Sequence, residues 1–135
     1  MKTPLLIGTD LTTLPQQNID LLKNPYLLAF NQDNVYGRPA TPYKWGTNPD
    51  WTYNETWPVE YRVVGAKAGI LVLVLNPSNK TNETKEAVWS EIPGLSNHSR
   101  QVMDVLSGKD LRCMQSYSAD ISSHDTAVIL VGQEC

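Results

Sequence analysis

The sequence lacks the features of a membrane-spanning or nucleic-acid-binding protein. Its longest uninterrupted apolar run, Ile70 to Leu75, is far shorter than the roughly 20 residues that a bilayer-spanning helix needs. Its 11 Lys and Arg residues are outnumbered by 14 Asp and Glu residues, and charge of neither sign is clustered. Binding to nucleic acid or to an anionic membrane requires clustered Lys and Arg. We therefore expect neither a nucleic acid nor a membrane as a partner.

The sequence also has too few strand–helix units for a complete α/β domain. Residues 4–10 have the pattern of a buried strand that ends in polar residues, and a helical stretch follows directly. A parallel strand needs neighbours on its edges and cover on its faces, but no second strand–helix unit exists in the sequence. The sequence therefore predicts the last unit of a larger α/β domain, and this chain as the tail of a longer protein.

Cysteine is scarce: the sequence has two, Cys113 and Cys135. In a secreted chain an even number of cysteines favours a disulfide, which here would close a loop of about 20 residues. The alternatives are two free thiols, or pairing of one cysteine outside this chain. No metal site is expected, because His124 and the two cysteines lack the closely spaced ligand pairs of zinc sites.

Glycosylation sequons are the strongest sign of cellular location. They number four, a modest excess over chance, and all four fall in expected loops: Asn54, Asn79, Asn82 and Asn97. N-glycosylation needs an exported, surface-exposed chain, so we expect an extracellular protein. The alternative is chance occurrence in loops rich in Asn and Thr. The first four residues show no signal-peptide apolar core.

Most of the chain is predicted to be β-structure. Short β-rich runs recur about every ten residues from residue 59 onward, which is typical of an antiparallel sandwich. We expect strands at residues 61–64, 70–75, 87–92, 102–106, 111–114, 117–121 and 127–131.

Two different segments precede the predicted strands. Apolar spacing predicts a helix that starts near Pro15 and stops at Asn24-Pro25, followed by a second short apolar element at residues 26–30. Residues 34–58 contain four prolines and six aromatic residues. Because such a proline density breaks regular structure, we expect an ordered connection without regular elements there.

A series of short motifs, in order along nearly the whole chain, resembles one enzyme family. Residues 5–11 (LLIGTDL), 21–24 (LLKN) and 29–33 (AFNQD) resemble the end of the catalytic barrel of eukaryotic retaining α-galactosidases. Residues 43–51 (YKWGTNPDW) and 87–95 (AVWSEIPGL) resemble the fungal branch of that family. Residues 107–111 (SGKDL) and 124–128 (HDTAV) resemble the late strands of the family's C-terminal domain.

The resemblance implies a mainly β fold, in which the last strand and helix of a (β/α)₈ barrel precede a C-terminal antiparallel β-sandwich. Residues 1–33 would be the barrel remnant, 34–58 the Pro- and aromatic-rich connection and 59–135 the sandwich. The implied parent is a secreted glycoside hydrolase that removes terminal α-D-galactosyl residues with retention and needs no cofactor. Its partners would be a galactoside substrate and, for this chain, the remainder of the barrel.

The chain is not expected to contain a catalytic residue. A retaining glycosidase uses two carboxyl groups about 5 Å apart. In the family that the chain resembles, both are Asp residues on earlier barrel strands, and no segment here matches either motif. We therefore expect the chain alone to be inactive. Asp10, at the end of the expected barrel strand, is a candidate for the active-site rim; the alternative is that it orients the loop before the helix.

Two roles other than catalysis follow from the residues. Trp45, Trp51 and Trp57 are candidates for a platform on which a sugar stacks, which would make the sandwich a carbohydrate-binding module. The alternative is that these rings pack the connection between the two domains. In a third interpretation the sandwich is structural and covers the edge of the barrel.

Overall fold

A computed structural model of the chain describes residues 10–32, 40–47, 56–65, 69–78 and 81–135. Two helices, α1 (Gln16–Leu22) and α2 (Pro25–Gln32), come first. The strands that follow are β1 (Thr41–Thr47), β2 (Thr56–Gly65), β3 (Gly69–Leu75), β4 (Glu83–Val88), β5 (Arg100–Asp104), β6 (Asp110–Met114), β7 (Ser116–Ile121) and β8 (Thr126–Glu134), with a 3₁₀ turn at Trp89–Glu91. The expected barrel strand near Leu5 lies outside the described residues.

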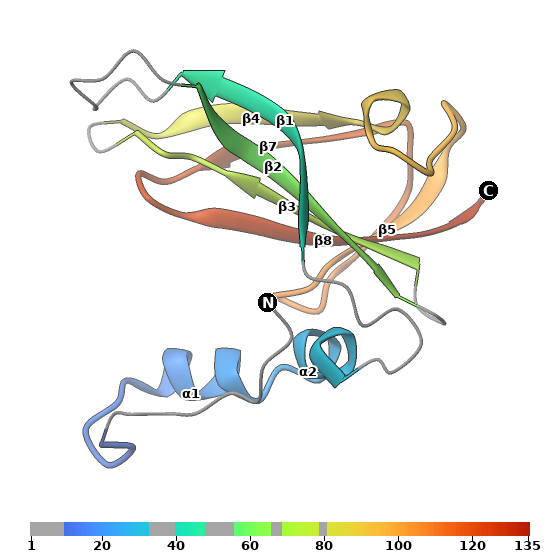
Figure 1. Ribbon diagram of the computed structural model, residues 1–135. Helices are drawn as coiled ribbons and strands as arrows, with labels where there is room; N and C mark the ends of the chain where they lie inside the picture. Colours follow the sequence, from blue (N-terminus) through green and yellow to red (C-terminus); the bar gives the residue numbers. More distant parts are fainter. Residues whose placement is uncertain (1–9, 33–39, 48–55, 66–68, 79–80) are drawn as a thin grey trace.

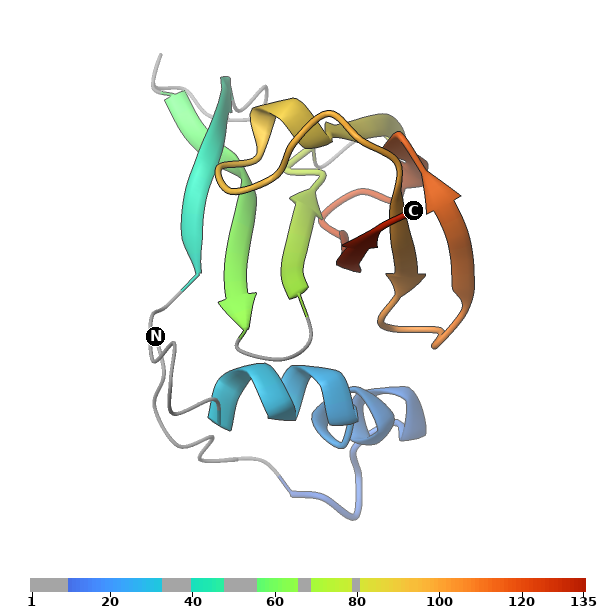
Figure 2. The same cartoon turned by 90° about the vertical axis from the view of Figure 1, so that its right-hand side faces the viewer.

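The strands form two antiparallel sheets, which agrees with the predicted β-sandwich. The larger sheet has the order β1-β2-β3-β8-β5-β6, and β4 pairs with β7 in the smaller one. The pair β4–β7 lies over one side of the larger sheet, whereas both helices lie on the other side (Figures 1 and 2). We call the side of the larger sheet that faces the helices its outer face.

The central strands are apolar on both faces because both faces are covered. Side chains alternate along β3, so Ile70, Val72 and Val74 enter the core between the sheets, where they pack with residues of β5, β7 and β8. Leu71 points to the outer face and packs with Phe30 of α2 in a second, smaller cluster. The continuous apolar run in the sequence is therefore a strand in the middle layer of the molecule.

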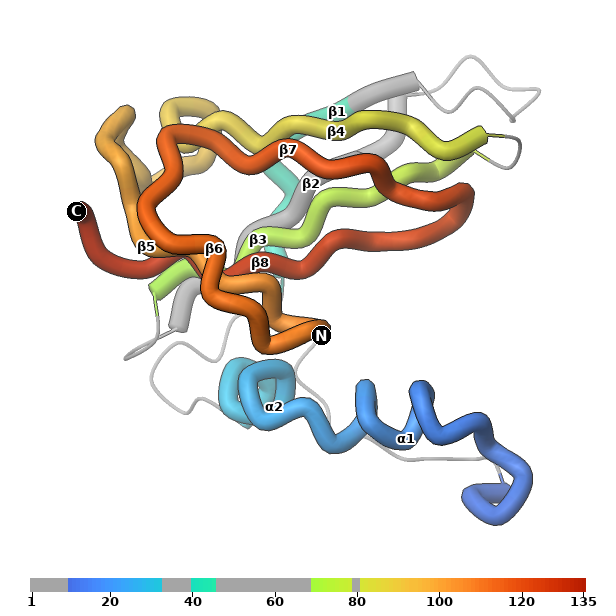
Figure 3. The backbone as a smooth tube through the Cα atoms, turned by 180° about the vertical axis from the view of Figure 1, so that it is seen from behind, coloured from blue at the N-terminus to red at the C-terminus, as the bar shows by residue number. Residues whose placement is uncertain are grey.

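Asn24 links the two helices to the sheet. Its Oδ1 accepts hydrogen bonds from the backbone N–H groups of Tyr26 (3.1 Å) and Leu27 (3.2 Å), which caps the start of α2. Its Nδ2 donates to the carbonyl of Val105 at 2.7 Å, just after β5. This bond holds the helices beneath the β5–β6 hairpin, which Figure 3 shows from behind. Within the described residues, no helix is long and apolar enough to cross a membrane.

A β-bulge interrupts the pairing of β5 with β6. Val102 pairs with Arg112 and Met103 with Asp110, so Leu111 is the extra residue. Arg112 has a φ of 65°, a left-handed conformation that is uncommon for a residue with a side chain. Leu111 and Met114, three residues apart, both pack against the core between the sheets. Strict alternation would place them on opposite faces, and the bulge removes that conflict.

The segment expected to be an irregular connection contains a strand. Within residues 34–58 the structure has β1, which pairs with β2 from Thr41 opposite Arg62 to Thr47 opposite Thr56. Pro42 is tolerated because β1 is the edge strand of the sheet. Pro58 lies in the part of β2 beyond its pairing with β3. Proline density therefore marks a sheet edge here, and the prediction of a segment without strands was wrong.

A disulfide joins Cys113 in β6 to Cys135, the residue that follows β8, with Cα atoms 6.3 Å apart. Because β5 lies between β6 and β8, the bridge connects β6 to the residue that follows a strand with which β6 does not pair. The backbone N–H of Cys135 also donates to the carbonyl of Ser99 at 2.9 Å. The end of β8 is thus fastened both covalently and by a hydrogen bond.

Replacing both cysteines with serine is expected to lower the free energy of unfolding by about 3 kcal/mol, because the unfolded chain regains the freedom of a loop of roughly 20 residues. Urea denaturation of the double variant and the unmodified chain measures the difference. The unmodified chain in a reducing buffer is the control, and it should unfold at the midpoint of the double variant. Equal midpoints for the double variant and the oxidised unmodified chain would contradict the prediction.

Candidate functional site

The outer face of the larger sheet carries a groove of about 920 Å³ beside the start of α2. Val102 and Val131 point into the core, so their neighbours Gln101, Met103, Leu130 and Gly132 face outward. Tyr26 of α2 stands on one side of the groove, and Asp110 and Arg112 of β6 also line it. We call this feature the β5–β8 groove.

The β5–β8 groove combines polar and apolar surface. Gln101, Gln133, Asp110 and Arg112 supply hydrogen-bond donors and acceptors, whereas Met103 and Leu130 supply apolar surface. Asp110 is the sole carboxylate among the described residues that line it. A retaining glycosidase needs two carboxyl groups across the bond that it breaks, and the described lining of this groove does not supply that pair.

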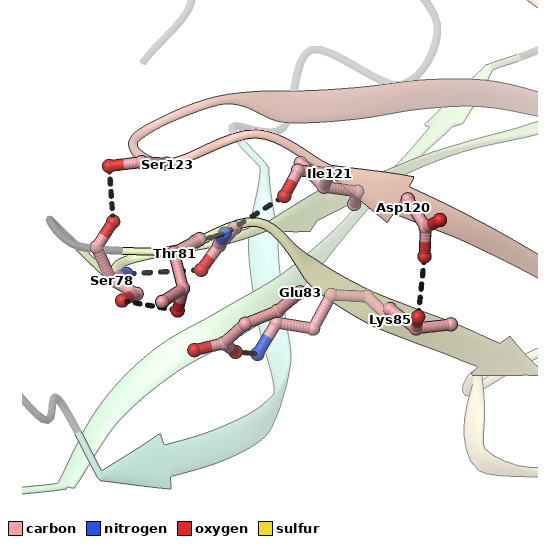
Figure 4. Close-up of polar contacts among 9 residues, drawn as sticks. Ser78, Thr81, Glu83, Lys85, Asp120, Ile121 and Ser123 are labelled. Carbon is pink, nitrogen blue, oxygen red and sulfur yellow. Dashed lines mark hydrogen bonds and ion pairs between the residues drawn. The ribbon is translucent and has the colours of Figure 1, made fainter.

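A second polar cluster, formed around Asn76, lies at one end of the sandwich, and Figure 4 shows its members Ser78, Thr81, Ile121 and Ser123. Asn76 is 1% exposed. Its Nδ2 donates to the carbonyls of Thr81 and Ile121, both at 2.9 Å, and its Oδ1 accepts from the N–H of Ser78 at 3.1 Å. The hydroxyl of Ser123 donates to the carbonyl of Ser78 at 2.7 Å. These bonds join the segment after β3 to the end of β7, so the cluster is structural.

The polar pairs beside this cluster lie on β4 and β7 (Figure 4). The hydroxyl of Thr84 donates to Oδ1 of Asp120 across the two strands at 2.5 Å. Lys85 forms an ion pair with Glu83 on the same strand. Exposed or half-exposed pairs of this kind add little to stability. None of these four residues is among the described residues that line the β5–β8 groove.

A third polar cluster fastens the end of β8. Oε1 of Glu134 accepts hydrogen bonds from Oγ of Ser96 and from the guanidinium of Arg100, each at 2.6 Å. Oε2 of Glu134 lies 3.2 Å from Nδ1 of His98. The hydrogen bond from Ser96, followed by that from His98, lowers the pKa of Glu134 below its ordinary value. The carboxylate therefore contributes to stability in its charged form.

This pKa shift predicts a loss of stability in acid. A carboxyl whose pKa is lowered by folding stabilises the protein above its ordinary pKa of about 4.5. That contribution is lost as the pH falls through the lowered pKa of the folded state. Glu134→Gln is therefore expected to lower the thermal midpoint at pH 7, and the deficit should shrink as the pH approaches 3.

The measurement is a series of thermal melts between neutral and acidic pH. Glu86→Gln, which changes an exposed glutamate of β4, is the matched control and should follow the unmodified chain at every pH. A deficit for Glu134→Gln that stays constant over the whole series would show that the charge of Glu134 is not involved.

Asp10 orients a local turn in the structure. It is exposed, and its Oδ1 accepts hydrogen bonds from the N–H (2.9 Å) and the hydroxyl (2.7 Å) of Thr12. These two hydrogen bonds lower the pKa of Asp10 below its ordinary value, and the bond from the Thr12 hydroxyl has the larger effect. This arrangement matches the alternative in which Asp10 orients the loop before the helix. Its candidacy for an active-site rim stays a prediction, because the preceding strand lies outside the described residues.

The remaining predicted positions are only partly covered by the structure. Asn82 and Asn97 are exposed, which leaves both sequons open to a glycan, whereas Asn54 and Asn79 lie outside the described residues. Trp45 on β1 is 57% exposed. Trp51 and the side chain of Trp57 are not described, so the three-tryptophan platform stays a prediction.

No metal site is present among the residues that the structure describes, since no three His, Cys, Asp or Glu side chains gather to hold an ion. Both cysteines are in the disulfide, and His98 and His124 lie on exposed turns. The β5–β8 groove and the Asn76 cluster were not predicted from the sequence. An Asn directly after the apolar run of β3 was the available signal for the Asn76 cluster, and the groove had none.

Comparison with known proteins points to one family. The sequence model of one protein family, the α-galactosidase C-terminal β-sandwich domain, matches residues 56–131. A probable α-galactosidase B from Penicillium simplicissimum is 50% identical over the whole chain, and one from Emericella nidulans is 46% identical. The chain spans about a third of the length of these relatives, 32% and 31% respectively.

Solved structures share the fold. α-Galactosidase I from Mortierella vinacea superposes with a TM-score of 0.71 at 21% identity, over 96% of this chain and 32% of that one. A family 27 β-L-arabinopyranosidase from Geobacillus stearothermophilus superposes with a TM-score of 0.77 at 14% identity, over 98% of this chain and 28% of that one. The family match covers more than half of the chain. The chain belongs to the family of α-galactosidase C-terminal β-sandwich domains.

Proposed function

We propose that this chain forms the C-terminal β-sandwich and the adjoining helices of a secreted α-galactosidase, which hydrolyses terminal α-D-galactosyl residues with retention. The observation that carries this proposal is the match of the whole chain to probable α-galactosidases B at 46–50% identity. The catalytic carboxylates would lie in the part of the enzyme that corresponds to the other two thirds of those relatives. The role of this chain would be structural.

The helices support a structural role beside a second domain. In the described structure α1 buries none of its residues, and Leu11 and Leu21 are 52% and 47% exposed. A seven-residue helix without a buried face is marginal in water, so α1 needs a partner surface. We assign that surface to the remainder of a (β/α)₈ barrel, which the two leucines would contact.

The test compares this chain with a chimera. In the chimera, the N-terminal two thirds of the Penicillium simplicissimum relative precede this chain at the matching position. Hydrolysis of an aryl α-galactoside is the readout, and we expect activity from the chimera and none from this chain. Hydrolysis by the pure chain, or a folded chimera without activity, would contradict the proposal. The intact relative serves as the control.

The extracellular location belongs to the same proposal. Two observations support it: the sequons at Asn82 and Asn97 are exposed, and the cysteines are paired. Expression in a secreting fungal host, followed by mass measurement before and after deglycosylation, tests the location. Retention of the protein inside the cell without a mass shift would contradict it.

A further inference from the structure

We propose that the β5–β8 groove binds a neutral saccharide. Its volume of about 920 Å³ lies in the range of small-molecule sites. Gln101 and Gln133 each present an amide donor and an amide acceptor, the two functions that a sugar hydroxyl needs. Tyr26, Met103 and Leu130 offer apolar surface for the C–H face of a sugar ring. This inference stands apart from the proposed enzymatic role.

The polar groups of the groove are free to bind a ligand. In the described part of the chain, the side chains of Gln101, Gln133 and Arg112 form no hydrogen bond to the protein. Asp110 accepts one hydrogen bond, from the backbone N–H of Arg112 at 2.8 Å, through Oδ1. Its second carboxylate oxygen remains available. Gly132 has no side chain, which leaves open the outer surface of β8 between these groups.

Local backbone geometry places Arg112 at the groove. The bulge in β6 and the φ of 65° turn Arg112 out of the strand alternation, and Asp110 holds this conformation through the backbone N–H. A non-glycine residue in the left-handed region is uncommon, and in this chain His124, with a φ of 56°, is a second example beside Arg112. A glycine would fit this backbone without strain. The bulge and this turn therefore place Arg112 among the residues that line the groove.

The charge of the groove favours a neutral ligand. Asp110 and Arg112 are the charged side chains among its described lining residues, and their formal charges cancel. An anionic ligand would meet the carboxylate and a cationic ligand the guanidinium, whereas a polyhydroxylated neutral ligand can use both. A saccharide satisfies these conditions through its hydroxyl groups.

The experiment is an NMR titration of this chain labelled with ¹⁵N, using melibiose and maltose as probes. Saturable shifts in the side-chain amide signals of Gln101 and Gln133, with a millimolar dissociation constant for either sugar, are expected. No shift with either sugar into the tens of millimolar would overturn the proposal. Shifts confined to the indole N–H of Trp45 would also overturn it, since they would place binding on β1.

Variants separate binding from folding. Gln101→Ala and Arg112→Gly are each expected to weaken binding about fivefold through loss of a hydrogen-bonding group. Arg112→Gly should keep or raise the thermal midpoint, because glycine relieves the backbone strain. Gln115→Ala, an exposed glutamine after β6 outside the groove lining, is the matched control and should bind as the unmodified chain does. Unchanged affinity in both groove variants would overturn the proposal.

Discussion

Replacing Trp89 with alanine is expected to lower the free energy of unfolding by about 4 kcal/mol. Trp89 is fully buried at the start of the 3₁₀ turn and packs in the core between the two sheets. Its indole N–H also donates to the carbonyl of Met114, at the end of β6, at 2.8 Å. The substitution would leave a large cavity and break this link at the same time.

Chemical denaturation measures this effect, and Trp89→Phe is the matched control. Phenylalanine keeps most of the buried ring but lacks the N–H donor, so its effect should fall between those of the unmodified chain and the alanine variant. An alanine variant that unfolds within about 1 kcal/mol of the unmodified chain would show that the core can collapse around the missing ring.

Asn76→Asp is expected to be similarly damaging, by about 4 kcal/mol at neutral pH. The change is nearly isosteric, but it replaces the two amide donors with a carboxylate oxygen that faces the carbonyls of Thr81 and Ile121. A charge buried against two carbonyl oxygens is strongly unfavourable. At acidic pH the carboxyl takes up a proton, so the penalty should shrink.

The control for this variant is Asn82→Asp, which makes the same chemical change at an exposed position just before β4. It should unfold with the unmodified chain at every pH. Denaturation curves at neutral and acidic pH measure both variants. An Asn76→Asp protein as stable as the control would mean that the Asn76 cluster does not hold the end of the sandwich together.

Apolar patterning was sufficient to predict the sandwich and its central strands. The run from residue 70 to 75 and the run from 127 to 131 are β3 and the greater part of β8, which pair with each other in the middle of the larger sheet. Such strands are specified by their own side chains, because burial on both faces demands apolar residues throughout. Local sequence and tertiary structure therefore agree there.

Elsewhere tertiary contacts decided the structure. The short apolar element at residues 26–30 is the helix α2 because Asn24 caps it and Phe30 enters the outer cluster. The strand expected over residues 87–92 ends at Val88, where the 3₁₀ turn carries Trp89 into the core. Neither outcome follows from residue periodicity within the segment.

The β5–β8 groove was beyond sequence prediction for a similar reason. Its residues come from α2, β3, β5, β6 and β8, and those of β3 and β5 meet only because β8 inserts between these two strands. The bulge at Arg112 carries no glycine that would have marked it in the sequence. The disulfide, by contrast, was favoured by the count of two cysteines, and the structure decides between that pairing and the alternatives of free thiols or a partner outside the chain.

The central position of β8 has a consequence for how the protein is made. β8 joins β3 to β5, yet it is the last strand of the sheet to leave the ribosome. Until β8 emerges, β1–β3 and β5–β6 are separate groups of strands, and the apolar strand β3 lacks its partner along one edge. Assembly of the sheet therefore awaits the synthesis of β8, and the nascent chain is exposed to aggregation until then. A stop codon before residue 126 would remove a small part of the mass but leave the sheet in two pieces.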